Sequence, residues 1–103
     1  MKMSKTTVDD VLDYLRVDDP TENEKVEVEN ILSAAKGYIL SYTGLEEEEL
    51  DLYDEIWTAL MVLCQDMYDN RARYVESGAT KALRNSGNTT VEIILNMHRK
   101  NLL

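Results

Sequence analysis

One apolar pattern between residues 53 and 68 constrains the fold more than any other feature of the sequence. Apolar residues recur there every three or four positions, the spacing that places side chains on one face of an α-helix. Every residue from Ala59 to Cys64 is apolar. A helix that is apolar on all sides must be covered on more than one face. The pattern predicts a central helix surrounded by other helices.

Three further segments carry helical patterns, and no segment shows the sustained alternation typical of a strand. Thr7 and Thr21 are candidate N-caps, each with an acidic residue three positions later, and Thr89 with Glu92 forms a third such pair. Gly44 suits the left-handed conformation that ends many helices. The sequence therefore predicts an all-α fold, a small bundle of four main helices at about residues 7–16, 21–43, 50–76 and 90–99, with a long loop at residues 77–88.

The length of the chain, 103 residues, predicts a single domain over residues 1–103 with one modest core. No apolar run approaches the ~20 residues that span a bilayer, and the N-terminus lacks the apolar segment of a signal peptide. We therefore expect a protein made inside the cell that does not associate with a membrane. The helical patterns place the following residues in the core: Leu12, Leu15, Ile31, Leu32, Ile39, Ile56, Trp57, Leu60, Leu63, Cys64, Met67, Ile94 and Leu95.

Charge is distributed unevenly along the sequence. The formal net charge is −9, from 11 basic and 20 acidic residues. Residues 1–69 hold 18 acidic and 5 basic residues, whereas residues 70–103 hold 2 and 6. An acidic surface disfavours a free-standing nucleic-acid binder, because binding to phosphate needs a basic one. A helix-turn-helix in the first two helices would turn the glutamates of residues 22–29 toward phosphates.

The residue types that carry chemistry are few. One cysteine and one histidine permit neither an intrachain disulfide nor the usual zinc sites. Cys64 lies in the most apolar run and is expected in the core, and His98 is expected to be a partly packed surface residue. No phosphate loop, nucleophile elbow or dinucleotide fingerprint is present. We expect no enzymatic activity, no cofactor and no metal site; a metal-dependent nuclease is the enzyme class that a cleavage assay would test.

Two charged clusters are candidate interaction sites. Four successive glutamates at the start of a helix point in different directions and do not converge on one cation. The acidic cluster is either a solvated helix start, which the helix dipole favours, or a patch that meets a basic partner. The basic cluster brackets the predicted loop and is either a solvated rim or a docking surface. The acidic cluster comprises Glu46, Glu47, Glu48, Glu49, Asp51 and Glu55, and the basic cluster comprises Arg71, Arg73, Lys81 and Arg84.

Several short motifs occur in a characteristic order along the chain. They are Leu15-Arg16-Val17-Asp18-Asp19, Ala34-Ala35, Tyr38-Ile39, Tyr42-Thr43-Gly44, Met67-Tyr68-Asp69-Asn70-Arg71 and His98-Arg99. Together with the spacing of the predicted helices, they resemble the small head-tail connector, or portal-adaptor, proteins of tailed bacteriophages and prophages. The resemblance spans nearly the whole chain.

The resemblance implies a structural, non-catalytic helical subunit that assembles with copies of itself into a ring. Such a ring docks on the portal protein beneath the DNA-filled head and receives the next tail-completion protein. The resemblance thus implies a place at the head-tail junction of the virion, after synthesis in the bacterial host cytoplasm. DNA would pass through the ring without specific binding, because an acidic lumen repels phosphates.

Ring assembly also suggests a use for the two charged clusters. In a closed ring, one surface of each subunit meets a different surface of the next, and opposite charges favour that contact over self-pairing. The acidic and basic clusters are therefore candidate contacts to a neighbouring subunit or to the portal. The alternative is a small acidic helical adaptor or regulator, of the anti-repressor or DNA-mimic type, that binds one protein partner through its basic C-terminal third.

Overall fold

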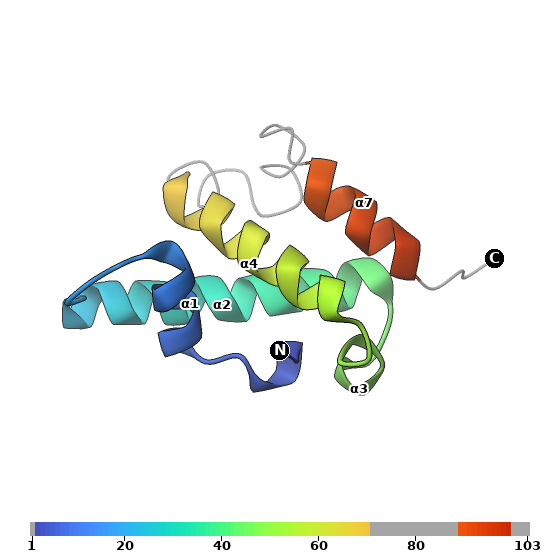
Figure 1. Ribbon diagram of the computed structural model, residues 1–103, viewed down its shortest axis with the longest axis horizontal. Coiled ribbons are helices and arrows are strands. Elements are labelled where there is room, and N and C mark those ends of the chain that lie inside the picture. The colour runs from blue at the N-terminus through green and yellow to red at the C-terminus, as the bar shows by residue number, and fades with distance from the viewer. Residues whose placement is uncertain (1, 71–88, 100–103) are drawn as a thin grey trace.

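The structure, a computed structural model, describes residues 2–70 and 89–99, and every regular element within them is a helix (Figure 1). A single 3₁₀ turn precedes the first α-helix, and a one-turn helix lies between the two longest helices. This architecture confirms the predicted all-α fold. The elements are η1 (Met3–Lys5), α1 (Val8–Leu15), α2 (Glu22–Thr43), α3 (Glu47–Leu50), α4 (Asp54–Asp69) and α7 (Thr89–His98).

The first two helices begin at the predicted capping boxes. The Asp10 amide donates to Thr7 Oγ1 at 3.3 Å, and the Thr7 amide donates to Asp10 Oδ2 at 2.9 Å. At α2 the reciprocal bonds between Thr21 and Glu24 are 3.1 and 3.2 Å. Each box satisfies amides that have no partner inside the helix, which explains why both helices begin where they do. The predicted capping pair at Thr89 lies at the edge of the described residues, and its bonds lie outside them.

Both helices end on residues with positive φ. Gly44, at φ 71°, ends α2 as predicted, and its amide donates to the carbonyl oxygen of Leu40 at 3.0 Å. Arg16 ends α1 at φ 60°, and Asp19 follows at φ 50° in the connection to α2. A side chain in this region is crowded against its own backbone, so the turn after α1 carries local strain.

Replacing Arg16 with glycine is expected to stabilise the protein by about 0.5–1 kcal/mol. The left-handed conformation costs an L-residue about 1–2 kcal/mol, and the greater freedom of glycine in the unfolded chain offsets part of the gain. Urea unfolding measures the difference. Glu29→Gly, at an exposed position inside α2, is the control and is expected to destabilise by about 1 kcal/mol. If Arg16→Gly lowers the free energy of unfolding as much as Glu29→Gly does, the backbone at Arg16 is not strained.

The third helix differs from its predicted range of residues 50–76. The acidic residues 47–49 form a separate short helix, α3, together with Leu50. Glu46 is its N-cap, and the Glu46 amide donates to Glu49 Oε1 at 3.2 Å. Leu50 is buried at its end, and α4 begins only at Asp54. Tyr53 is the exposed N-cap of α4 rather than part of its buried face. The remainder of the predicted helix beyond residue 70 and the predicted loop at residues 77–88 lie outside the described residues.

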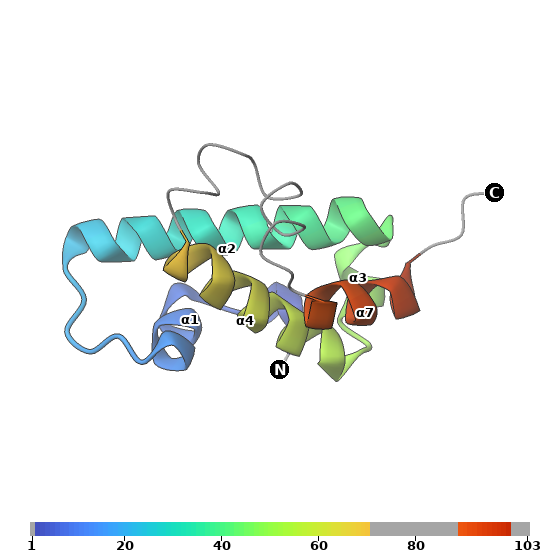
Figure 2. The ribbon, with the colours of Figure 1, turned by 90° about the horizontal axis from the view of Figure 1, so that it is seen from above.

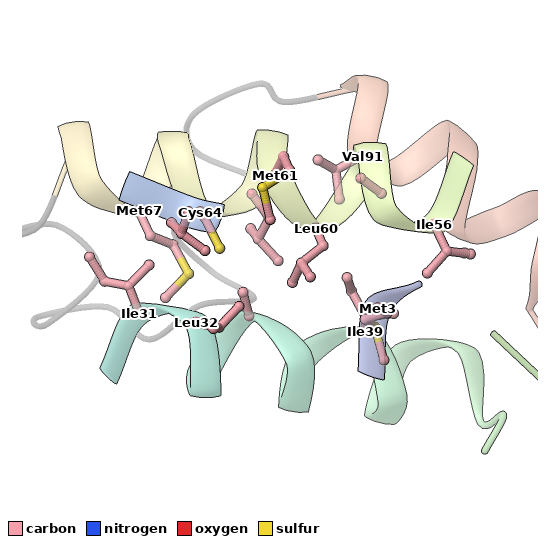
Figure 3. Close-up of a cluster of buried hydrophobic side chains, with 14 of the residues drawn as sticks. Met3, Ile31, Leu32, Ile39, Ile56, Leu60, Met61, Cys64, Met67 and Val91 are labelled. Carbon is pink, nitrogen blue, oxygen red and sulfur yellow. The ribbon is translucent and has the colours of Figure 1, made fainter. Parts of the chain in front are cut away.

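Helix α4 is the centre of the packing, as its apolar pattern predicts. It packs against α2 on one side and α7 on another, and α1 contacts both α2 and α4 (Figures 1 and 2). Within its apolar run Ala59, Leu60, Met61 and Cys64 are completely buried. In Figure 3, Leu60 and Cys64 face the side chains of α2, whereas Met61 lies near Val91 of α7.

Most of the predicted core is buried. The buried members are Leu12, Ile31, Leu32, Ile39, Ile56, Leu60, Leu63, Cys64, Met67 and Leu95. Three predicted core residues, Leu15, Trp57 and Ile94, are only partly buried and pack against the edge of the core. The Trp57 ring meets Tyr14 edge-on, with 6.4 Å between the ring centroids. The Trp57 side chain therefore closes the core toward α1 instead of filling its centre.

The structure also buries apolar residues that are not among the predicted core residues. These are Met3, Val11, Val28, Ala35, Leu50, Ala59, Met61 and Val91. Met3 belongs to η1, which packs against α3 and α4, so the N-terminal turn is part of the fold. Among the described residues, no helix is both long and apolar enough to cross a membrane.

Candidate interaction surface

The acidic segment, residues 46–49, is exposed at all four positions. It caps and forms α3, and negative charge at a helix start is favoured by the backbone amides there. In the part of the chain that the structure describes, no three histidine, cysteine or acidic side chains are placed to share a metal ion. The four glutamates therefore form an exposed negative surface.

Asp51, in the same predicted cluster, binds within the chain. Its carboxylate accepts hydrogen bonds from the Ser4 amide at 3.0 Å and from the Ser4 hydroxyl. The hydroxyl bond is the main cause of a lowered pKa of Asp51, and nearby Lys2 and Lys5 lower that pKa further. Asp51 thus fastens η1 to the turn after α3.

Glu55, the last member of the acidic cluster, pairs with His98. His98 Nε2 lies 2.7 Å from Glu55 Oε1, and the His98 ring lies against the Tyr53 ring with 4.1 Å between the centroids. The pKa of Glu55 is lowered, first by a hydrogen bond from its own backbone amide at the start of α4 and then by His98. The His98 side chain is only 12% exposed, as expected for a partly packed histidine. This contact joins the end of α7 to the start of α4.

A second contact holds α7 against α2. The Tyr42 hydroxyl donates to Asn96 Oδ1 at 2.6 Å, and the Arg99 guanidinium carbon lies 5.2 Å from the centroid of the Tyr42 ring. A cation above an aromatic face is attracted by the ring quadrupole. The last turn of α7 is therefore attached to α2 and to α4 by polar contacts on two sides.

No family model, curated protein or solved structure matches this chain.

The predicted basic cluster, Arg71, Arg73, Lys81 and Arg84, lies outside the described residues. The described chain instead gathers basic side chains around η1, where Lys2 and Lys5 are exposed beside Asp51. Lys36 Nζ of α2 donates to the carbonyl oxygen of Thr6 at 3.3 Å. Sequence reasoning missed this group because Lys36 lies more than 30 positions from Lys2 and Lys5 and shares no pattern with them.

Cys64 has no role at this surface. It is buried in the core, and burial raises the pKa of its thiol to about 12. The thiolate that would react or bind metal is therefore absent at neutral pH, as expected for a cysteine that packs as a small apolar side chain.

The bond between Ser4 and Asp51 predicts a pH-dependent effect of Ser4→Ala. Because the pKa of Asp51 is lower in the folded protein than its ordinary value of 3.8, its ionised form favours the fold above that value. This stabilisation is lost as the pH falls through the lowered pKa. We expect Ser4→Ala to raise the pKa of Asp51 and to destabilise the protein most at neutral pH, with the difference from wild type shrinking in acid.

Urea unfolding from pH 7 down to pH 2 measures this difference, and a carboxyl NMR titration follows Asp51 directly. Ser33→Ala, at an exposed position of α2, is the matched control and is expected to change neither quantity. If Ser4→Ala lowers the free energy of unfolding by the same amount at every pH, the Asp51 charge has no role in this contact.

Proposed function

We propose that this protein is a head-tail connector that forms a ring beneath the portal and links the DNA-filled head to the tail. The observation that carries the proposal is the order of the helices. The short α1, the long α2 that closes at Gly44, the buried α4 and the final short α7 follow one another as the resemblance to connector proteins implies. The motifs that begin at Leu15, Tyr42, Met67 and His98 lie at the ends of these helices, whereas Ala34-Ala35 and Tyr38-Ile39 lie within α2.

Charge supports a head-to-tail arrangement of the subunits. Asp51 and Glu55 are half-buried and bind within the chain, so residues 46–49 are the exposed carboxylates of the acidic cluster, and among them Glu49 also accepts a hydrogen bond from the Glu46 amide. The basic residues follow after residue 70 in the sequence. Each exposed ion pair contributes about 0–1 kcal/mol, so in the ring these charges set the register of neighbours, and apolar contacts supply the affinity.

The acidic N-terminal part suits a ring through which DNA moves. Exposed acids occur on α1 at Asp9 and Asp13 and on α2 at Glu22 and Glu29. A lumen bordered by such groups repels phosphate and keeps the duplex from adhering. We expect no retention of duplex DNA by the isolated protein in a gel-shift assay at low salt.

Deletion of the gene from the phage or prophage that carries it tests the proposed function. We expect DNA-filled heads and complete tails that fail to join, visible by negative-stain electron microscopy. Supplying the wild-type gene in trans restores intact particles. Normal virions without the protein would overturn the proposal.

The second candidate function is an acidic adaptor that binds one protein partner. The partner would bind to the basic C-terminal third, and the exposed acids of α1, α2 and α3 favour the DNA-mimic form of this candidate, because a dense negative surface resembles that of DNA. The mass of the complex separates the two functions. Light scattering shows a closed ring for a connector and a single copy bound to a single partner for an adaptor.

A further inference from the structure

Four exposed apolar side chains flank one contact between α4 and α7. They account for most of the large hydrophobic side chains that the described residues expose; Tyr14 on α1 and Val26 on α2 are the others. We call these four residues the apolar patch. Its members are Leu52, 77% exposed, Tyr53, 39%, Ile93, 60%, and Met97, 70%.

The contact between the Tyr53 and His98 rings brings the two halves of the apolar patch together. Leu52 and Met97 are the sequence neighbours of Tyr53 and His98, whose rings are in contact at an interplanar angle of 35°. Ile93 precedes Met97 by four residues, so both side chains share one face of α7. Figures 1 and 2 both place the end of α7 beside the start of α4. Exposed apolar groups gathered in this way are typical of a surface that binds another protein.

Acidic side chains border the apolar patch on the side of Leu52. Residues 46–49 and Asp54 are exposed next to Leu52 in the sequence, and they form no ion pair with another described residue. On the α7 side, Glu92 is half-buried, and exposed Arg99, which follows Met97 by two residues, lies over the Tyr42 ring. A complementary surface therefore carries apolar side chains together with basic groups that face the acidic border.

The chain itself carries a stretch with that chemistry. Residues 71–84 contain four basic residues and one acidic residue, together with the apolar Tyr74, Val75 and Leu83. Copies that each carry a net charge of −9 repel one another unless unlike surfaces meet. We propose that the apolar patch of one copy binds residues 71–84 of the next copy, with residues 46–49 facing the basic side chains. The inference rests on the proposed ring, because it needs a contact between two different surfaces of the same chain.

Photo-crosslinking from Leu52 tests which segment binds the patch. The change Leu52→benzoylphenylalanine keeps an apolar side chain at an exposed position, and an isotopically labelled second copy distinguishes crosslinks between chains from those within one chain. Mass spectrometry of the digested product is expected to place the crosslink within residues 71–84 of a second copy. Crosslinks only within one chain, or to residues 93–97 of a second copy, would overturn the proposal. The same probe at Val26 is the control and is expected to give no crosslinked pair.

Sedimentation of point variants tests the contribution of the patch to association. Leu52→Glu and Met97→Glu are each expected to weaken self-association at least about tenfold, whereas Val26→Glu adds the same charge on α2 and is expected to leave it within about twofold. Unchanged association in both patch variants would overturn this inference and leave the connector function standing. A wild-type chain that stays monomeric up to about 1 mM would overturn the inference as well. Gene deletion, described above, decides the connector function separately.

Discussion

Replacement of Met3 by alanine is expected to destabilise the protein by about 2–5 kcal/mol, the range measured when large core side chains are truncated. Met3 is among the largest fully buried side chains, although it lies two residues from the start of the sequence. It belongs to η1, which packs against α3 and α4, and Figure 3 shows it in the same buried cluster as Ile39 of α2. Truncation leaves a cavity there, because the bond between Ser4 and Asp51 holds the turn in place.

Urea unfolding followed by circular dichroism measures the loss. Met97→Ala is the matched control, since the same side chain is removed from a 70% exposed position and the stability is expected to change by no more than about 0.5 kcal/mol. Equal stability of the two variants would show that the N-terminal turn does not belong to the cooperative fold.

Local sequence signals predicted the helices well. Capping at Thr7 and Thr21 and termination at Gly44 depend on residues three or four positions apart, so they can be recognised before the chain folds. The central apolar run likewise predicted that α4 would be covered on several sides, because burial of an all-apolar helix admits no other arrangement.

Contacts between distant positions could not be predicted in this way. Ser4 and Asp51 are 47 positions apart, and neither residue type indicates the other. Because the sequence does not reveal that contact, the apolar pattern predicted that residues 50–53 begin a long helix. In the structure, buried Leu50 ends α3 and the chain turns before α4 begins at Asp54.

The candidate surface was predicted only in part for the same reason. A run of glutamates is exposed in almost any fold, so residues 46–49 could be assigned to the surface from sequence alone. The partners of Asp51 and Glu55 are set by the positions of η1 and α7, which tertiary packing decides. The apolar patch is a product of the same packing, because Leu52 and Met97 are 45 positions apart and become neighbours of one contact only through Tyr53 and His98.

Leu95→Ala is expected to destabilise the attachment of α7 by about 2–5 kcal/mol. Val91 and Leu95, one turn apart, are the completely buried side chains of this helix. A helix of 10 residues is marginal in water without packing, so α7 stays helical because these side chains bind it to α4 and α2. We therefore expect amide hydrogen exchange to accelerate more in residues 89–99 than in residues 54–69. Leu52→Ala, which removes a 77% exposed leucine, is the control and is expected to leave exchange in both segments unchanged.

The effect of Leu95→Ala on α7 also tests the proposed contact between copies. Leu95 is completely buried, so its side chain is not exposed to a neighbouring copy, yet its truncation is expected to release the helix that carries Ile93 and Met97. Self-association in Leu95→Ala is therefore expected to fall together with the protection of residues 89–99, whereas Met97→Glu weakens association and leaves that protection intact. If exchange instead accelerates equally throughout the described chain, α7 unfolds only with the whole bundle. In that case the apolar patch is as rigid as the core beneath it.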